Sequence, residues 1–154
     1  MIPKIETDPV EIRTHLPTPV GTILANLKLP ARAVILAKDT MHELSIAESI
    51  LSIVRQYVSP DEEVRVRAIG IKVGESSGVV ADSLEFSFSA ITAETPLHHA
   101  RLQIEHIPFT LFCTPCGEVR PGSGGAAVCP VCGGVDTKVL GGTELQVVDI
   151  ELDD

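Results

Sequence analysis

Four cysteines within twenty consecutive residues constrain this chain more than any other feature of its sequence. Cys113 and Cys116 form one Cys-x-x-Cys pair, and Cys129 and Cys132 form a second pair after twelve intervening residues. Each pair makes a tight turn that directs two thiolates at one point, and two such turns complete a tetrahedron around one ion. The spacing therefore predicts a closed site of four sulfur ligands, which is typical of structural zinc and leaves no open position for catalysis.

The segment between the two pairs, residues 117–128, contains few large apolar side chains and cannot build a core by itself. Structural zinc contributes about 10–16 kcal/mol in small zinc-dependent peptides, which is enough to fold such a segment. Gly117 and Gly133 directly follow the two pairs, at positions where we expect the knuckle turn to require a positive φ. The metal is therefore expected to have a structural role.

Four cysteines also occur as two disulfides, as an iron site or as a redox dithiol. The sequence does not start with a basic region, an apolar stretch and a small-residue cleavage site, so we expect no secretion. Disulfides are rare in reducing compartments. A metal site in a cytoplasmic protein is therefore the favoured interpretation.

The region from Met41 onward alternates helical and extended patterns, interrupted by turn residues. The predicted elements are a helix over 44–58 that ends before Pro60, a strand over 64–73 with a bulge or two buried faces, a helix capped by Asp82 with Glu85, a long strand over 100–112, and a closing strand over 145–152. This order predicts an α+β fold, a small mixed domain of two helices on a three-stranded sheet. The four-cysteine, zinc-ribbon-like module, residues 107–142, is inserted before the closing strand, so residues 41–106 and 143–154 form the main domain.

Residues 1–40 have a different character. They contain five of the eleven prolines and show no sustained period of 2 or 3.6 residues, although residues 31–37 are apolar enough for a short strand or turn. We expect a poorly ordered extension, or upstream sequence translated from a wrong start codon.

The charge of the chain excludes some classes of function. Residues 41–154 contain seven basic and seventeen acidic side chains, a net of −10 within a chain total of −9. A nucleic-acid-binding protein normally presents a basic face, so no nucleic-acid partner is expected. No apolar run approaches the roughly 18 residues that span a bilayer, so no membrane contact is expected. The sequence contains no Gly-rich phosphate loop, no nucleophile with a plausible base and no paired catalytic carboxylates, and we predict that the protein is not an enzyme.

Met41, His42 and Glu43 precede the first predicted helix. If translation begins at Met41, its α-amine, the amide of His42 and the imidazole can chelate one ion in a plane, an arrangement that suits nickel(II) or copper(II). The α-amine has a reference pKa of about 7.7–8.0, so its deprotonation near neutral pH requires little free energy.

Several motifs occur in a fixed order: Met41-His42-Glu43, Val73-Gly74-Glu75 with Ser77-Gly78-Val79, Leu84-Glu85-Phe86-Ser87-Phe88, the two Cys-x-x-Cys pairs, and Leu145-Gln146-Val147. Over residues 41–154 the chain thereby resembles the HypA/HybF family, the nickel metallochaperones of [NiFe]-hydrogenase maturation. The resemblance implies that Met41, His42 and Glu43 hold Ni(II) as transient cargo and that Cys113, Cys116, Cys129 and Cys132 hold structural Zn(II). It also implies two partners, a HypB-type GTPase and the hydrogenase large-subunit precursor, and it leaves a homodimer open.

One departure from the family pattern affects the nickel site. Forty residues precede Met41, and an internal amide nitrogen ionises far less readily than a terminal amine. We hypothesise that Met41 is the natural initiator. The alternative to a nickel chaperone is a zinc-ribbon module that binds proteins or nucleic acid and has no nickel function.

Four other side chains near these motifs are expected to have ordinary roles. Glu75 is expected in a cap or on the surface, and His98 and His99 in an exposed loop. His106 shares the strand parity of apolar neighbours, so a core or interface position is expected for it.

Overall fold

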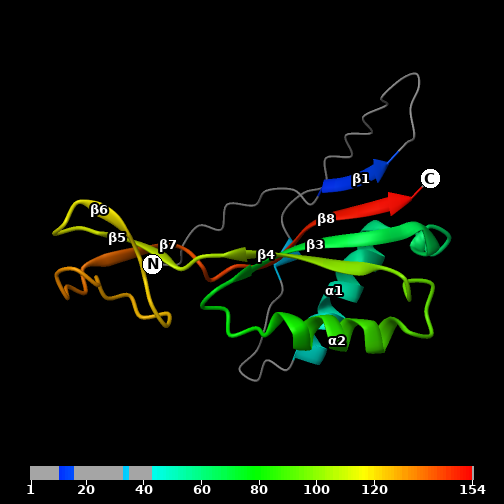
Figure 1. The fold of residues 1–154 in the computed structure, drawn as a ribbon. Coiled ribbons are helices and arrows are strands. Elements are labelled where there is room, and N and C mark those ends of the chain that lie inside the picture. Colours follow the sequence, from blue (N-terminus) through cyan, green and yellow to red (C-terminus); the bar gives the residue numbers. More distant parts are fainter. Residues whose placement is uncertain (1–10, 16–32, 35–42, 154) are drawn as a thin grey trace, which may run out of the picture.

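The computed structural model describes residues 11–15, 33–34 and 43–153. The chain folds into two lobes, each built on its own sheet (Figure 1). The larger lobe contains the helices. The smaller lobe contains the cysteines and projects from one end of the larger sheet.

The larger sheet has five strands in the order β1-β8-β3-β4, with β2 also paired to β8. The strands are β1 (Glu11–His15), β2 (Ala33–Val34), β3 (Val66–Gly74), β4 (Arg101–Ile107) and β8 (Leu145–Asp153). Strand β3 runs parallel to β4 and antiparallel to β8. The strands β8, β3 and β4 are the three that the sequence predicted for the main domain.

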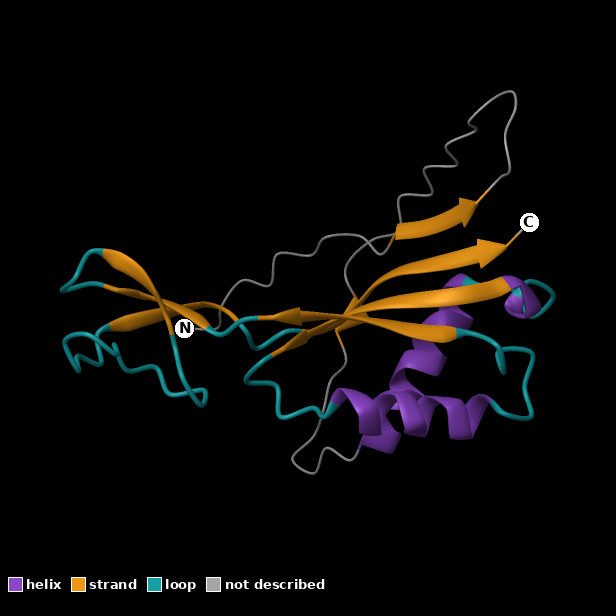
Figure 2. Ribbon diagram, viewed as in Figure 1, coloured by secondary structure: helices purple, strands orange, loops and turns teal. Residues whose placement is uncertain are grey.

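Both helices cover one face of this sheet, below it in Figure 2. They are α1 (Glu43–Tyr57) and α2 (Ala81–Thr92), and a 3-10 turn, η1 (Glu63–Arg65), leads into β3. Helix α1 buries the side chains of residues 46, 47, 50, 53 and 54, a spacing that forms one helical face. Leu84 and Phe88 of α2 are buried in the same core, beside Ile69 and Ile71 of β3. The α+β fold with two helices on a sheet is therefore confirmed.

The predicted irregularity in β3 is present. The register against β8 shifts between Val66 and Ala68 and again between Gly70 and Ile71. Each shift changes which side chains face the helices, and nearly all residues of the strand are buried. Both of the features that the sequence suggested, a bulge and burial on two faces, therefore occur.

The predicted cap of α2 was wrong. Val80 is the N-cap residue, and no side chain caps the helix start. Asp82 is already the second residue of the helix, so its carboxylate cannot occupy the N-cap position from which a side chain reaches the orphan N–H groups of the first turn.

The long strand predicted over residues 100–112 is two strands in two different sheets. Strand β4 ends at Ile107, and β5 (Thr110–Cys113) begins the small sheet of order β6-β5-β7 with β6 (Glu118–Pro121) and β7 (Thr137–Gly141). Pro108 lies at the break and has no N–H to continue a ladder. The chain leaves one lobe for the other at this proline.

Two parts of residues 1–40 form strands along β8. β1 pairs with β8 in parallel over five residues, and β2 pairs with it antiparallel at Val147 and Gln146. β2 lies within residues 31–37, where the sequence allowed a short strand, whereas β1 is extended where the sequence suggested poor order. The rest of residues 1–40, together with Met41 and His42, lies outside the described residues.

Among the described residues, no helix is both long enough and apolar enough to span a bilayer.

Candidate metal centre

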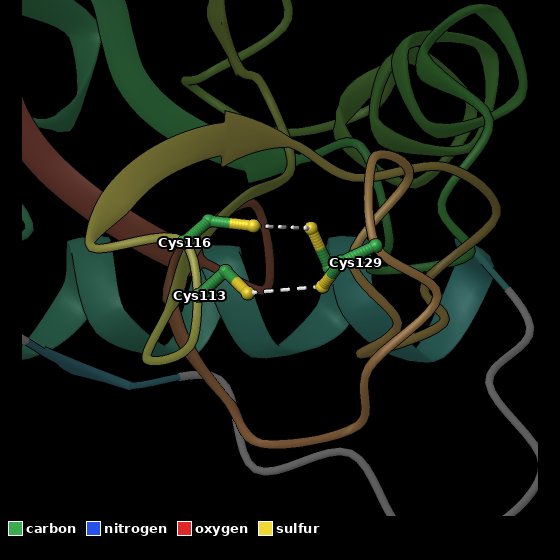
Figure 3. Close-up of side chains that lie close together, drawn as sticks. Cys113, Cys116 and Cys129 are labelled. Carbon is green, nitrogen blue, oxygen red and sulfur yellow. Dashed lines mark hydrogen bonds between the residues drawn. The ribbon is translucent and has the colours of Figure 1, made fainter.

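The Sγ atoms of the four cysteines meet at one point in the smaller lobe. All of them lie within 4.8 Å of one another. Cys113 Sγ is 3.6 Å from Cys132 Sγ, and Cys116 Sγ is 3.9 Å from Cys129 Sγ. Figure 3 shows Cys113 and Cys116 facing Cys129 across this gap. In a tetrahedron with metal–sulfur bonds of about 2.3 Å the sulfurs are about 3.8 Å apart, so the four thiols fit a tetrahedral zinc ion.

The two cysteine turns have the same backbone geometry. Gly117 donates its N–H to Cys113 O at 2.9 Å, and Gly133 donates its N–H to Cys129 O at 2.9 Å. Both glycines adopt positive φ, 68° and 70°. This confirms the conformation predicted for them and explains why glycine stands there, since a Cβ is strained in that region.

The pKa values of Cys116 and Cys129 are shifted in opposite directions by the groups around them. The backbone N–H groups of Cys132 and Val131 lower the pKa of Cys129 to about 6, because they stabilise a thiolate. Hydrogen bonds with the side chains of Cys132 and Cys113, together with burial, raise the pKa of Cys116 to about 12, because they favour its protonated form. A cation at the centre of the cluster would favour the ionised form of all four thiols.

The cluster contains cysteine alone and is partly enclosed. No His, Asp or Glu of the described chain joins the four thiols. Cys113 and Cys129 are buried beside Phe109 and Leu111, whereas Cys132 is exposed. All four cysteines are free thiols, and their spacings far exceed a disulfide bond of about 2.05 Å. The disulfide alternative therefore does not apply to this structure.

Of the start motif, only Glu43 is described. It is the first residue of α1 and is half-buried, so its carboxylate lies at the positive end of the helix dipole. The structure therefore leaves the predicted grouping of Met41, His42 and Glu43 untested. His98 and His99 are exposed in the loop before β4, as predicted.

Of the core or interface position expected for His106, the core position was wrong. Its side chain is exposed near the end of β4, although its parity matches Leu102 and Ile104. Those two residues pack on the helical core, which does not extend to the end of the strand.

The structure adds a joint between the lobes that the sequence did not reveal. Glu75, in the loop after β3, accepts a hydrogen bond from Phe109 N–H at its Oε2 atom, at 2.9 Å. Glu75 N–H donates to Ile107 O at 2.9 Å, and Ser76 N–H donates to Gly142 O at 2.7 Å. These bonds tie the β3–α2 loop to both ends of the cysteine module.

Comparison with known proteins now decides the family. The family profile described as "Hydrogenase/urease nickel incorporation, metallochaperone, hypA" matches residues 41–152, about three-quarters of the chain. The chain belongs to the HypA family. This confirms the resemblance inferred from the ordered motifs. The family description names a metallochaperone, which agrees with the expectation that the protein is not an enzyme.

Curated HypA relatives match over most or all of their length. A hydrogenase maturation factor HypA of Geobacter metallireducens is 40% identical over 113 residues, which are 73% of this chain and 100% of that protein. Its counterpart in Albidiferax ferrireducens is 34% identical over the same shares of the two chains. The Streptomyces avermitilis HypA is 39% identical over 116 residues, 74% of this chain and 88% of the relative.

Two solved structures share the fold. The solution structure of the Ni metallochaperone HypA from Helicobacter pylori superposes with a TM-score of 0.51 at 20% identity, covering 73% of this chain and 97% of that one. A second HypA solution structure gives a TM-score of 0.53 at 21% identity, covering 74% and 98% of the two chains. The fold is therefore shared with these two HypA proteins.

Proposed function

We propose that this chain is a nickel metallochaperone that delivers Ni(II) for the maturation of [NiFe]-hydrogenase and contains a structural zinc site. Membership of the HypA family is the observation on which the proposal rests. The family description names both hydrogenase and urease. Hydrogenase is the proposed client because the curated relatives are named as hydrogenase maturation factors.

The chemistry of the four-cysteine cluster supports zinc as its metal. Four thiolates in a tetrahedron are the usual ligands of structural zinc, and the distances between the sulfurs fit its bond length. We assign Cys113, Cys116, Cys129 and Cys132 as the ligands. The bound ion would supply the positive charge that allows all four thiols to ionise and so hold the two turns together.

We assign nickel to the start motif, with Met41, His42 and Glu43 as the site residues. Amine, amide and imidazole nitrogens suit Ni(II), whereas the sulfur cluster has no free ligand position. Glu43 begins α1, so the two residues before it immediately precede a fixed helix start. With Met41 as the initiator, as hypothesised above, the site lies at a chain end and is easily opened, which suits a carrier that must release its ion.

The partners of this function follow from the family resemblance. We propose a HypB-type GTPase as the protein that cooperates in loading nickel and the hydrogenase large-subunit precursor as the acceptor. Both steps are proposed to take place in the cytoplasm.

The test of the nickel site is the His42→Ala variant of a chain that begins at Met41. Removal of the imidazole is expected to abolish stoichiometric nickel binding, measured by equilibrium dialysis, while the zinc content stays at one ion per chain. His99→Ala provides the matched control, because it removes an exposed imidazole far along the sequence. Unchanged nickel binding by His42→Ala would remove His42 from the site, and no nickel binding by the parent chain would favour the zinc-ribbon alternative.

A further inference from the structure

Phe86 is an exposed aromatic residue in a chain with only four phenylalanines. It lies in α2 within the segment Leu84–Phe88, in which Leu84 and Phe88 fill the core. Phe86 instead points outward and is 75% exposed. Burial on folding therefore explains two of these apolar side chains and leaves Phe86 unexplained.

A groove of about 570 Å³ runs beside Phe86. Helix α2 forms one wall and the start of β4 forms the other. Its lining residues are Asp82, Glu85, Phe86, Phe88, Ser89, Ala100, Arg101 and Leu102. The groove thus combines apolar and polar side chains, as protein-binding sites do.

Strand β4 is the last strand on its side of the described sheet, so its outer edge is unpaired there. Such an edge presents a row of backbone N–H and C=O groups that can bind an added strand. A strand added beside β4 would continue the sheet outward over the flank of α2, because α2 lies under this part of the sheet (Figure 1). Every second side chain of that strand would then face the groove.

The charges of the groove are divided between its walls: two carboxylates lie on α2, and the guanidinium of Arg101 lies at the start of β4. The α2 wall therefore favours basic side chains in the occupant. Asp82 and Glu85 are exposed, and neither carboxylate has a hydrogen bond or an ion pair with any described residue. Asp82 and Phe86 are one helical turn apart, about 6 Å along the axis. Alternate residues of a strand are about 6.6 Å apart, so a basic and an apolar side chain two positions apart match this spacing.

We propose that the groove between α2 and β4 binds an extended segment of a partner protein that pairs with the β4 edge, covers Phe86 with an apolar side chain and places basic side chains at Asp82 and Glu85. The site lies on the larger lobe and is built without the cysteine cluster. The proposed binding site is therefore independent of the metal assignments above. If the binding proposal fails, the metal assignments are unaffected, and the reverse also holds.

The test uses the whole chain, labelled with nitrogen-15, and a short synthetic peptide as the probe. Lysine, leucine and lysine occupy alternate positions of the peptide, with threonine between them. Binding is expected to shift the amide signals of β4 and of residues 82–89. A second peptide has the same composition with lysine, leucine and lysine consecutive, and a third has glutamate in place of lysine; both are expected to bind at least about tenfold more weakly.

Two variants locate the contact. Phe86→Ala is expected to weaken binding of the alternating peptide about tenfold, and Asp82→Asn with Glu85→Gln to weaken it about fivefold and to reduce its dependence on salt. Val135→Ala is the matched control, since Val135 is 77% exposed but lies in the smaller lobe. All these side chains are exposed, so unchanged spectra away from the groove will show that the fold is intact.

Three results would overturn the proposal. The first is equal binding of the alternating and the rearranged peptide, which would indicate charge attraction alone. The second is undiminished binding by Phe86→Ala or shifts confined to the smaller lobe. The third is a shift of the same amide signals with increasing protein concentration in the absence of peptide. That result would show that a second copy of the chain occupies the groove.

Discussion

The carboxylate of Glu75 accepts a hydrogen bond from the backbone N–H of Phe109, and this 2.9 Å contact joins the helical lobe to the cysteine lobe. Phe109 is also the first buried residue of the cysteine lobe, where it packs with Leu111 and the buried cysteines. Pro108 has no N–H and cannot donate a hydrogen bond. The N–H of Phe109 is therefore the first backbone donor after the break between the lobes, and Glu75 accepts its hydrogen bond.

Loss of this carboxylate should loosen the joint without unfolding either lobe. In Glu75→Ala the Phe109 N–H loses its acceptor, and we expect hydrogen exchange at this amide to become about fivefold faster, equivalent to about 1 kcal/mol. Glu75→Gln retains an acceptor oxygen and should preserve most of the protection. Hydrogen exchange of the Phe109 amide, measured by NMR, distinguishes the two variants. Equal protection of this amide in Glu75→Ala and in the parent chain would show that the bond contributes nothing.

Gly142 forms the other side of the joint. It adopts a φ of +96°, and a Cβ at this position would overlap the backbone of Phe109. Gly142→Ala therefore combines backbone strain with a clash against main chain that cannot move aside, and we expect it to lower the free energy of unfolding by more than about 2 kcal/mol. Denaturant unfolding measures this loss.

Gly78→Ala is the matched control for that variant. Gly78 also has a positive φ, 75°, but nothing lies within 4 Å of the added Cβ. Only the conformational strain remains, so we expect a loss of about 1 kcal/mol. Equal losses in the two variants would contradict a steric role for Gly142.

Removal of one thiol should unfold the cysteine module and spare the helices. In Cys116→Ala the cluster keeps three thiols, and the segment between the pairs has no apolar core to replace the metal. We expect loss of stoichiometric zinc and collapse of amide signal dispersion over residues 113–141, with α1 unchanged. Thr114→Ala, an exposed neighbour in the same turn, should keep zinc. Full zinc content in Cys116→Ala would contradict a four-thiolate site.

One pH effect is expected in the turn after α1. The hydroxyl of Ser59 donates to Glu62 Oε2 at 2.6 Å, and this bond, followed by a bond from the Ser59 backbone, lowers the pKa of Glu62. A lowered pKa in the folded state stabilises the fold above the unfolded pKa, and this contribution is lost as the pH falls through the folded pKa. Ser59→Ala should therefore raise the pKa of Glu62, measured by carbon-13 NMR titration, whereas Ser52→Ala should leave it unchanged.

The local parts of this structure could be predicted from the sequence. The spacing of Cys113, Cys116, Cys129 and Cys132 specifies one cluster, because each pair is a local turn. Helix α1 follows from a continuous apolar face that ends before Pro60. Both patterns depend on residues close together in the chain, and such patterns are the most informative for prediction.

The contacts between distant segments could not be predicted. The apolar residues shift from even positions, Leu102 and Ile104, to odd positions after His106, and Pro108 lies within the shifted part. This local break does not reveal that the chain passes into a second sheet there. The bond from Phe109 to Glu75 spans 34 residues, and no local pattern links its two ends. The exposure of His106 likewise depends on where the helical core ends, which strand parity does not specify.

The most direct measurement of the central claim is a metal titration of the chain that begins at Met41, followed by challenge with a chelator of intermediate strength. The proposed function predicts one zinc and one nickel per chain, with nickel removed first and zinc retained with a folded cysteine module. A chain that binds zinc but no nickel, or one that loses both ions together, would contradict the proposal of a closed sulfur site beside a separate, exchangeable nickel site.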